Sequence, residues 1–178
     1  MIIGVTGSIG TGKTTVARMF QKRGARVIDA DKIVHRILDK PARVRLSAFV
    51  FDDKDALLQL CKAIHPIVKK EIFSQIRSIR DGKPVVIDAP LLFESGLDRK
   101  CDFVVVVKAS RRTQVERARK NLRLSRNQII KRIKMQMPLR KKTALADFVI
   151  NNNGALKDTE KQARKIWEEL ARRKRWKR

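Results

Sequence analysis

The chain has 178 residues, 43% of them hydrophobic and 34% charged, which suits one domain with a buried core and argues against disorder. No basic segment precedes its apolar start and no apolar run is long enough to cross a bilayer, so we expect a cytoplasmic protein without signal peptide or membrane anchor. The net charge is +25, of which residues 99–178 carry +19 (26 Lys and Arg against 7 Asp and Glu). This excess predicts a polyanionic partner, either a nucleic acid or a nucleotide with several phosphates.

Short apolar runs alternate with segments of helical periodicity along the chain. Such alternation predicts an α/β fold in which helices cover a parallel, five-stranded sheet. In chain order, strands are expected at 2–5, 26–28, 84–87, 102–107 and 148–150, and helices at 13–23, 32–39, 66–79, 111–121, 126–135 and 156–173. Two isolated cysteines, Cys61 and Cys101, show no metal-ligand spacing and are expected to be inert thiols.

Two helical stretches depart from this alternation. Residues 41–82 show no convincing strand and are predicted to form an insert that binds the acceptor substrate. Residues 111–142 are predicted to form a basic lid, because 14 Lys and Arg but only one acidic residue lie between positions 108 and 142. Cations that close over a transferred phosphoryl group stabilise its charge, although most of them can equally form a solvated face. The remaining segments, about 1–40, 83–110 and 146–175, are predicted to form the core of a single domain.

The glycine-rich turn after the first expected strand carries the sharpest motif. Two glycines five positions apart, followed by lysine and a hydroxyl residue, match the P-loop pattern of P-loop NTPases. Its backbone N–H groups wrap a triphosphate, the lysine reaches the β- and γ-phosphates, and the hydroxyl can hold Mg²⁺. The alternative is an ordinary glycine-rich turn. The predicted ATP-binding residues are Gly7, Ser8, Ile9, Gly10, Thr11, Gly12, Lys13, Thr14 and Thr15, with Thr14 also a predicted metal ligand.

Carboxylates follow two of the expected strands. Asp88 closes the strand at 84–87 and is predicted as the second Mg²⁺ ligand, with a turn or helix cap as the alternative. Asp29 and Asp31 follow the second strand, at the edge of the sheet where ligands bind. Asp31 is therefore placed to face an acceptor hydroxyl, or else to cap a helix that begins at Lys32. His65 precedes a helix expected to open at Pro66, and it is either a packing residue or a site residue.

Taken together, the motifs resemble the dephospho-coenzyme A kinase family in order and spacing. The segments that carry the resemblance are GSIGTGKTTVA, VIDADKI, IHPIVKKEI, IDAPLLFESGL, Gln114 with Glu116 and Arg117, Gln136, and ADFVINNNG. They cover nearly the whole chain. PLLFE and ADFVINNNG are more specific to this family than the P-loop is.

The resemblance implies transfer of phosphate from ATP, with Mg²⁺, to the 3'-hydroxyl of dephospho-coenzyme A. It implies that Asp31 is the base or orienting group, that Lys13 acts on the phosphates, and that Arg117 belongs to the lid. Asn152 and Gly154 are implied to lie near the adenine of ATP. The implied acceptor-binding residues are Asp31, His65, Pro90, Leu91, Leu92, Phe93 and Glu94.

The chain departs from the family pattern twice. The stretch between Asp31 and His65 is about twenty residues shorter than expected, a change that loops tolerate at modest thermodynamic cost. The loop before Arg43 is the part predicted to be missing, with a helix at 46–51 retained. Asn121 stands where a second lid arginine is usual, and Arg119 or Arg123 is expected to replace it.

Two other readings remain open at this point. A nucleoside monophosphate kinase or another small-metabolite kinase would share the P-loop and the lid. A nucleic-acid-binding protein could use the basic half, although tyrosine is absent and only Trp167 and Trp176 lie in the basic tail. Charge alone would give non-specific, salt-sensitive binding, and we expect no obligate protein partner.

Overall fold

The computed structural model describes residues 1–38 and 54–176. The strands are β1 (Ile2–Gly7), β2 (Arg26–Asp29), β3 (Val85–Asp88), β4 (Phe103–Lys108) and β5 (Phe148–Asn151). The helices are α1 (Lys13–Gln21), α2 (Ala30–Ile37), α4 (Lys54–Ser78), α5 (Arg111–Leu122), α6 (Arg126–Met135), α7 (Leu139–Ala144) and α8 (Leu156–Trp176), with a short 3₁₀ helix η1 (Asp98–Lys100).

All five strands form one parallel sheet in the order β2-β3-β1-β4-β5. The predicted five-stranded parallel sheet is therefore confirmed. The first strand in the chain lies at the centre and pairs with both β3 and β4. Because the strands are parallel, their carboxyl ends meet at one edge, where the P-loop and the ends of β2 and β3 come together.

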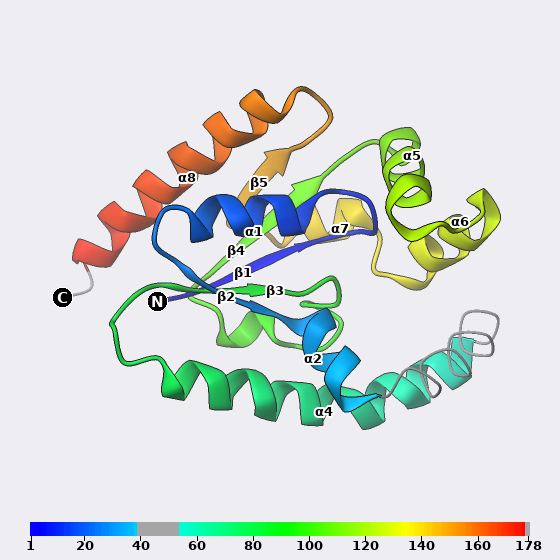
Figure 1. Cartoon of the computed structure of the whole chain (residues 1–178), viewed down its shortest axis with the longest axis horizontal. Coiled ribbons are helices and arrows are strands. Elements are labelled where there is room, and N and C mark those ends of the chain that lie inside the picture. Colours follow the sequence, from blue (N-terminus) through cyan, green and yellow to red (C-terminus); the bar gives the residue numbers. More distant parts are fainter. Residues whose placement is uncertain (39–53, 177–178) are drawn as a thin grey trace.

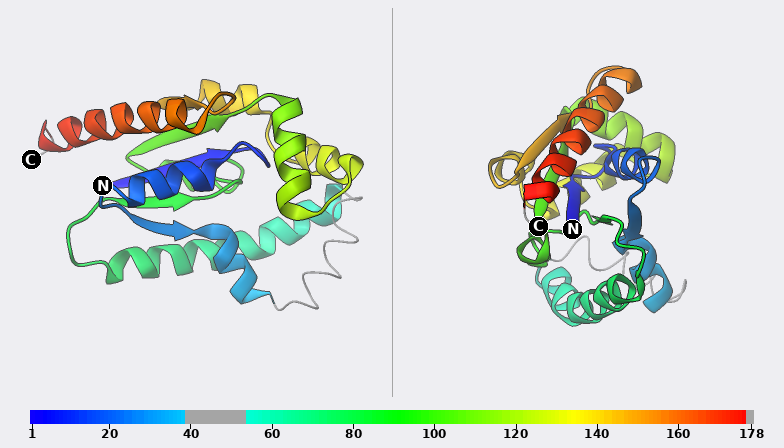
Figure 2. Two further views of the ribbon diagram at one scale, coloured as in Figure 1. Left: turned by 45° about the horizontal axis from the view of Figure 1, so that its top comes forward. Right: turned by 90° about the vertical axis from the view of Figure 1, so that its left-hand side faces the viewer.

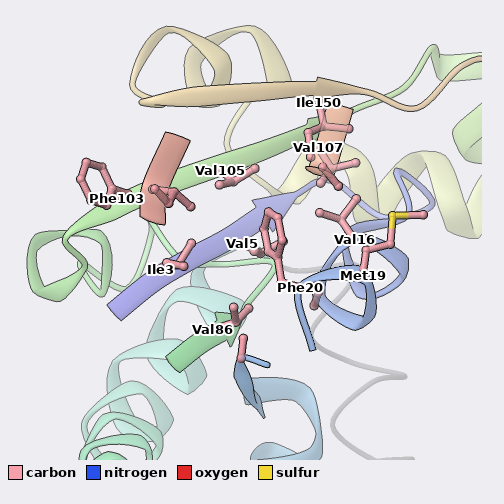
Figure 3. Close-up of a cluster of buried hydrophobic side chains, with 14 residues drawn as sticks. Ile3, Val5, Val16, Met19, Phe20, Val86, Phe103, Val105, Val107 and Ile150 are labelled. Atoms are coloured by element: carbon pink, nitrogen blue, oxygen red, sulfur yellow. The ribbon is translucent and has the colours of Figure 1, made fainter. Parts of the chain in front are cut away.

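Each face of the sheet is covered by its own helices (Figure 2). Alternate residues of β4 point to opposite faces, with Val105 and Val107 in one apolar cluster and Val104 and Val106 in the other. On the first face α1 and α8 pack against the sheet, and Phe20 stacks on Trp167 with ring centroids 5.6 Å apart. Figure 3 shows side chains of α1 turned toward those of the central strands. On the second face α2, α4 and the loop at 90–97 form the cover.

Helices α5 and α6 project from the edge toward which the strands point (Figure 1). A small apolar cluster joins them through Val115, Ala118 and Ile129, and Ile9 of the P-loop packs against it. The predicted basic lid thus rests directly on the predicted nucleotide loop.

Three details differ from the prediction. Helix α4 begins by Lys54 and runs through Pro66, so the expected helix start at Pro66 is wrong. Apolar residues on both sides of this proline, such as Ile64 and Val68, pack on the same cluster and hold the helix together despite the lost backbone donor. Helix α2 begins at Ala30 instead of Lys32, and the short helix α7 was not predicted.

The expected shortening before Arg43 and the helix at 46–51 lie outside the described residues. Among the residues that are described, no helix is both long enough and apolar enough to span a membrane.

Candidate active site

The P-loop connects β1 to α1 in a conformation that requires glycine. Gly10 and Gly12 have φ angles of 74° and 89°, in the left-handed region that side chains disfavour. A Cβ at Gly10 would collide with the backbone carbonyl of Gln114, and one at Gly12 with the side-chain amide of Asn152. Gly12 is the N-cap of α1, so the positive end of that helix faces the edge of the sheet. The loop therefore offers the anion-binding geometry that its sequence predicts.

Buried side chains hold this loop in place through hydrogen bonds. Thr11 donates its hydroxyl to the carbonyl of Ser8 at 2.9 Å, and Asn152 donates its side-chain amide to the carbonyl of Thr11 at 2.8 Å. Thr159 in turn donates to the side-chain oxygen of Asn152 at 2.8 Å. Asn152 and Thr159 are both buried. Asn152 thus holds the P-loop in place, while Gly154 lies exposed in the turn before α8.

Gln136, the C-cap of α6, connects the lid to the loop. Its side-chain oxygen accepts hydrogen bonds from the Ser8 hydroxyl at 2.9 Å and from the Ile9 amide at 3.2 Å. The next residue, Met137, donates its amide to Glu94 at 2.8 Å. We call this pair the Gln136–Met137 junction. It joins the lid, the P-loop and the 90–97 loop within two residues.

The 90–97 loop holds most of the residues predicted to bind the acceptor. Glu94 forms an ion pair of 2.9 Å with Lys142, whose side chain is fully buried and also donates to the Pro90 carbonyl. Burial lowers the pKa of Lys142, while Glu94 opposes that shift. Thr6 donates to the same carbonyl at 3.3 Å. Glu94 and Pro90 are thus bound to neighbouring elements as well as lying at the predicted acceptor site.

The remaining predicted acceptor residues differ in exposure. Leu92 is fully buried against Gly4 in the apolar core, so it shapes the loop from below. Leu91, Phe93 and His65 are half-buried. Burial lowers the pKa of His65, with Lys69 acting in the same direction and Glu94 against it.

Lys142 was missed by sequence reasoning because it is one of fourteen cations between positions 108 and 142. Nothing in the sequence separates it from the solvated ones.

Asp29 and Asp88 are neighbours in the sheet, since β2 and β3 pair in that register. The Asp88 side chain is buried, and its Oδ1 atom has no hydrogen-bond partner among the described residues. Burial raises the pKa of Asp88, whereas Lys13 and a hydrogen bond from Thr14 lower it. A buried carboxylate oxygen without a partner, beside a hydroxyl group, suits a hard cation such as Mg²⁺.

In the described part of the chain, no group of three His, Cys, Asp or Glu side chains could hold a metal ion. Magnesium is commonly bound through one or two carboxylates together with the phosphates of a substrate. The pair Thr14 and Asp88 therefore fits this cation as part of a nucleotide complex.

Asp31 lies in the first turn of α2 with a free carboxylate. Asp29, not Asp31, caps the helix by accepting from the Lys32 amide at 3.0 Å, so the capping alternative for Asp31 is wrong. Asp31 is exposed to solvent, and its carboxylate forms no hydrogen bond within the described residues. Desolvation by the walls of the site raises its pKa, and the charge of Lys13 opposes this. A carboxylate that senses the P-loop lysine and has no structural partner is available for chemistry.

Arg117, the predicted lid arginine, projects from α5 toward the P-loop. It donates to the carbonyl of Asn152 at 2.8 Å and lies 3.9 Å from the position that a Cβ at Gly12 would occupy. Arg119, Asn121 and Arg123 are exposed, and the structure singles out neither arginine as the replacement for Asn121.

Both cysteines are free thiols. Burial raises the pKa of Cys101 to about 12 and also raises that of Cys61. Both thiols are therefore mainly protonated at neutral pH, and their inertness stays a prediction.

The family model described as dephospho-CoA kinase matches residues 1–45 and 40–158 of the chain. Dephospho-CoA kinase of Bacillus licheniformis is 38% identical over 93% of this chain and 94% of its own length. The chain belongs to the dephospho-CoA kinase family. The enzyme of that name from Aquifex aeolicus is 35% identical over 96% of this chain and 97% of its own.

Solved structures agree with this assignment. The chain resembles dephospho-CoA kinase from Campylobacter jejuni with a TM-score of 0.68 and 26% identity, over 96% of this chain and 97% of that one. Shikimate kinase from Acinetobacter baumannii, at 18% identity and a TM-score of 0.63, covering 97% and 94%, shares the fold. The two segments matched by the family model meet at residues 40–45, inside the interval where the sequence predicts a shortening relative to the family.

Proposed function

We propose that this chain transfers the γ-phosphoryl group of ATP to the 3'-hydroxyl of dephospho-coenzyme A, giving coenzyme A and ADP in the last step of coenzyme A synthesis. The observation that carries the proposal is the Asp31 carboxylate, which has no hydrogen-bond partner among the described residues and whose pKa, raised by desolvation, is lowered in part by the charge of Lys13, in a chain of this family. The carboxylate belongs to the acceptor side and the lysine to the donor side, so the transferred group passes between them.

On the donor side, the amides of the P-loop and the start of α1 bind the triphosphate. Lys13 stabilises the charge that grows on the β/γ-bridging oxygen as its bond to phosphorus breaks. Thr14 and Asp88 would hold Mg²⁺, which neutralises charge on the β- and γ-phosphoryl oxygens when bound. Arg117 adds a cation from the lid beside Gly12.

On the acceptor side, Asp31 orients the 3'-hydroxyl toward the phosphorus and accepts its proton as the new bond forms. The oxygen–phosphorus bond to the acceptor replaces the one to ADP, so the proton ends on Asp31 and the electron pair on ADP. The raised pKa of Asp31 makes it a stronger base than an ordinary aspartate. His65, Leu91, Phe93 and the fixed 90–97 loop form the surface against which the acceptor lies.

A coupled ADP-release assay tests the proposal. Dephospho-coenzyme A is compared with AMP, adenosine and shikimate as acceptors, each with and without Mg²⁺. Turnover is expected to be fastest with dephospho-coenzyme A and to require the metal. Much faster turnover of AMP or shikimate would instead place the chain among the other small-molecule kinases.

A weak affinity for nucleic acid is a second proposed property, favoured by exposed cations on α5, such as Arg111 and Arg119, and near the end of α8, such as Arg172 and Arg173. Such binding is non-specific and weakens steeply with salt, because it depends on counterion release. Removing residues 172–178 should reduce RNA binding in a filter assay and leave turnover near normal. Sequence-specific binding that persists in high salt would overturn this account. We also propose that the reaction takes place in the cytoplasm, where ATP is supplied.

A further inference from the structure

A cavity of about 510 Å³ lies beside the edge strand β2, between α1 and α2. Thr14, Asp29 and Asp88 line one part of it, at the carboxyl ends of the strands. From there its lining continues along successive turns of both helices, as far as Gln21 on α1 and Arg36 on α2. One end of the cavity therefore lies beside the predicted metal ligands Thr14 and Asp88, and Lys32, the neighbour of Asp31 in the chain, contributes to its lining.

Beyond that end, three basic side chains, Arg18, Lys32 and Arg36, line the cavity among apolar and neutral polar residues. Arg18 and Lys32 are exposed, and neither side chain forms an ion pair or a hydrogen bond with a residue in the described ranges. Arg36 has a loose pair of 3.7 Å with Glu71, and both side chains remain largely exposed. The carboxylate of Asp29 already accepts a hydrogen bond from the backbone amide of Lys32. Unpaired cations around a concave surface attract phosphate groups.

The proposed acceptor carries a phosphate group of this kind at the right separation from its reacting atom. Its ribose bears the 3'-hydroxyl that Asp31 orients and, on the same ring, a 5'-diphosphate. Lys32 is the next residue after Asp31, and Arg36 lies about 7.5 Å further along the helix axis than Asp31, at a rise of 1.5 Å per residue. A diphosphate on the ribose therefore falls within reach of these cations when the hydroxyl is at Asp31. The triphosphate of ATP is held elsewhere, at the amino end of α1.

We propose that this cavity binds the diphosphate of the acceptor through Arg18, Lys32 and Arg36. The inference rests on the proposed function and adds a determinant of specificity to it. The cavity distinguishes a nucleoside with a 5'-diphosphate ester from a bare nucleoside, whereas Asp31 recognises only the hydroxyl.

The test compares Arg18→Met, Lys32→Met and the double variant with wild type at constant ionic strength. Arg99→Met is the matched control, because Arg99 is exposed and precedes β4, which lies on the other side of the central strand β1 from β2. Each single variant should raise KM for dephospho-coenzyme A about tenfold, the effect of losing one hydrogen bond to a charged group, and the double variant should raise it further. The values of kcat and of KM for ATP should stay within about twofold.

Two further measurements separate this role from others. Adenosine lacks the diphosphate, so its kcat/KM should be the same in wild type and variants. Calorimetric titration of dephospho-coenzyme A without ATP should show the same loss of affinity as KM, and thermal melting checks that each variant is folded. Lys32→Gln serves if a methionine variant unfolds.

The proposal is overturned if the variants behave like Arg99→Met, if adenosine suffers equally, or if KM for ATP rises in the same proportion. The last outcome would assign the cavity to the diphosphate of the donor. Wild type without turnover of dephospho-coenzyme A would instead sink the proposed function itself. An active wild type with unaffected variants sinks only the role of the cavity.

Discussion

The donor and acceptor sides of the site are built differently. Behind the P-loop, Thr11, Asn152, Thr159 and Gln136 form a continuous set of hydrogen bonds among themselves and with the loop backbone. Across the site, Asp31 has no hydrogen-bond partner in the described residues. The donor loop is thus preorganised before any ligand arrives, whereas the acceptor side keeps its polar groups available. The loop that binds the common cosubstrate ATP can therefore be rigid, whereas recognition of the specific acceptor depends on polar groups that the protein itself leaves unpaired.

The largest expected effect comes from the free carboxylate. Asp31→Asn keeps the size of the side chain but removes the basic oxygen, so kcat should fall by about 10²- to 10⁴-fold. Because the donor side does not depend on Asp31, affinity for Mg²⁺-ATP, measured by fluorescent nucleotide displacement, should remain nearly unchanged. Wild-type turnover would remove Asp31 from the mechanism. A large loss of ATP affinity would make it a metal-site residue and make Asp29 the next base to test.

The corresponding change on the donor side is Lys13→Ala. Loss of a cation directed at developing charge should lower kcat by about 10²- to 10³-fold with the fold intact, as circular dichroism can confirm. The acceptor should still bind, which titration with dephospho-coenzyme A would detect. Near-normal turnover in a folded variant would break the assignment of the donor side.

A third change tests how the two sides are joined. Lys142→Met leaves Glu94 without its buried partner, and urea unfolding should show a loss of about 3 kcal/mol, the lower end for a broken buried pair because Glu94 is partly exposed. The double variant Lys142→Met with Glu94→Gln removes the unpaired charge and should recover part of the loss. A single variant as stable as wild type would mean that the ion pair does not hold the 90–97 loop.

The smallest effect concerns pH. Because desolvation by the surrounding protein raises the pKa of Asp31, its protonated and inactive form persists to higher pH than in an ordinary aspartate with a pKa of 3.8. The acid limb of kcat/KM should therefore lie above that pH and should disappear from the residual activity of Asp31→Asn. An acid limb that is unchanged in the variant belongs to another group.

The sequence was most informative where backbone geometry demands particular residues. The P-loop glycines, the parallel sheet and the placement of Asp31 and Asp88 at strand ends all follow from local pattern. The start of α4 was misplaced because Pro66 usually begins or ends a helix, and long-range packing outweighs that preference here.

The role of a residue was harder to predict from the sequence where it depends on a partner far away in the chain. Lys142 is buried only because the fold brings Glu94 and the Pro90 carbonyl to it. The cap of α2 was assigned to Asp31 as an alternative, but Asp29 takes that role because the helix starts two residues earlier. No local pattern in the sequence distinguishes these cases.

The central position of β1 has a consequence for biosynthesis. The strand and the P-loop that follows it leave the ribosome before their partners β3 and β4, and before Asn152, which donates to the carbonyl of Thr11. A nascent chain that ends before residue 152 lacks this contact, so we expect it to bind ATP more weakly, and to gain less stability from ATP, than the finished domain. The P-loop of this enzyme is thus synthesised well before the residue that holds it in place.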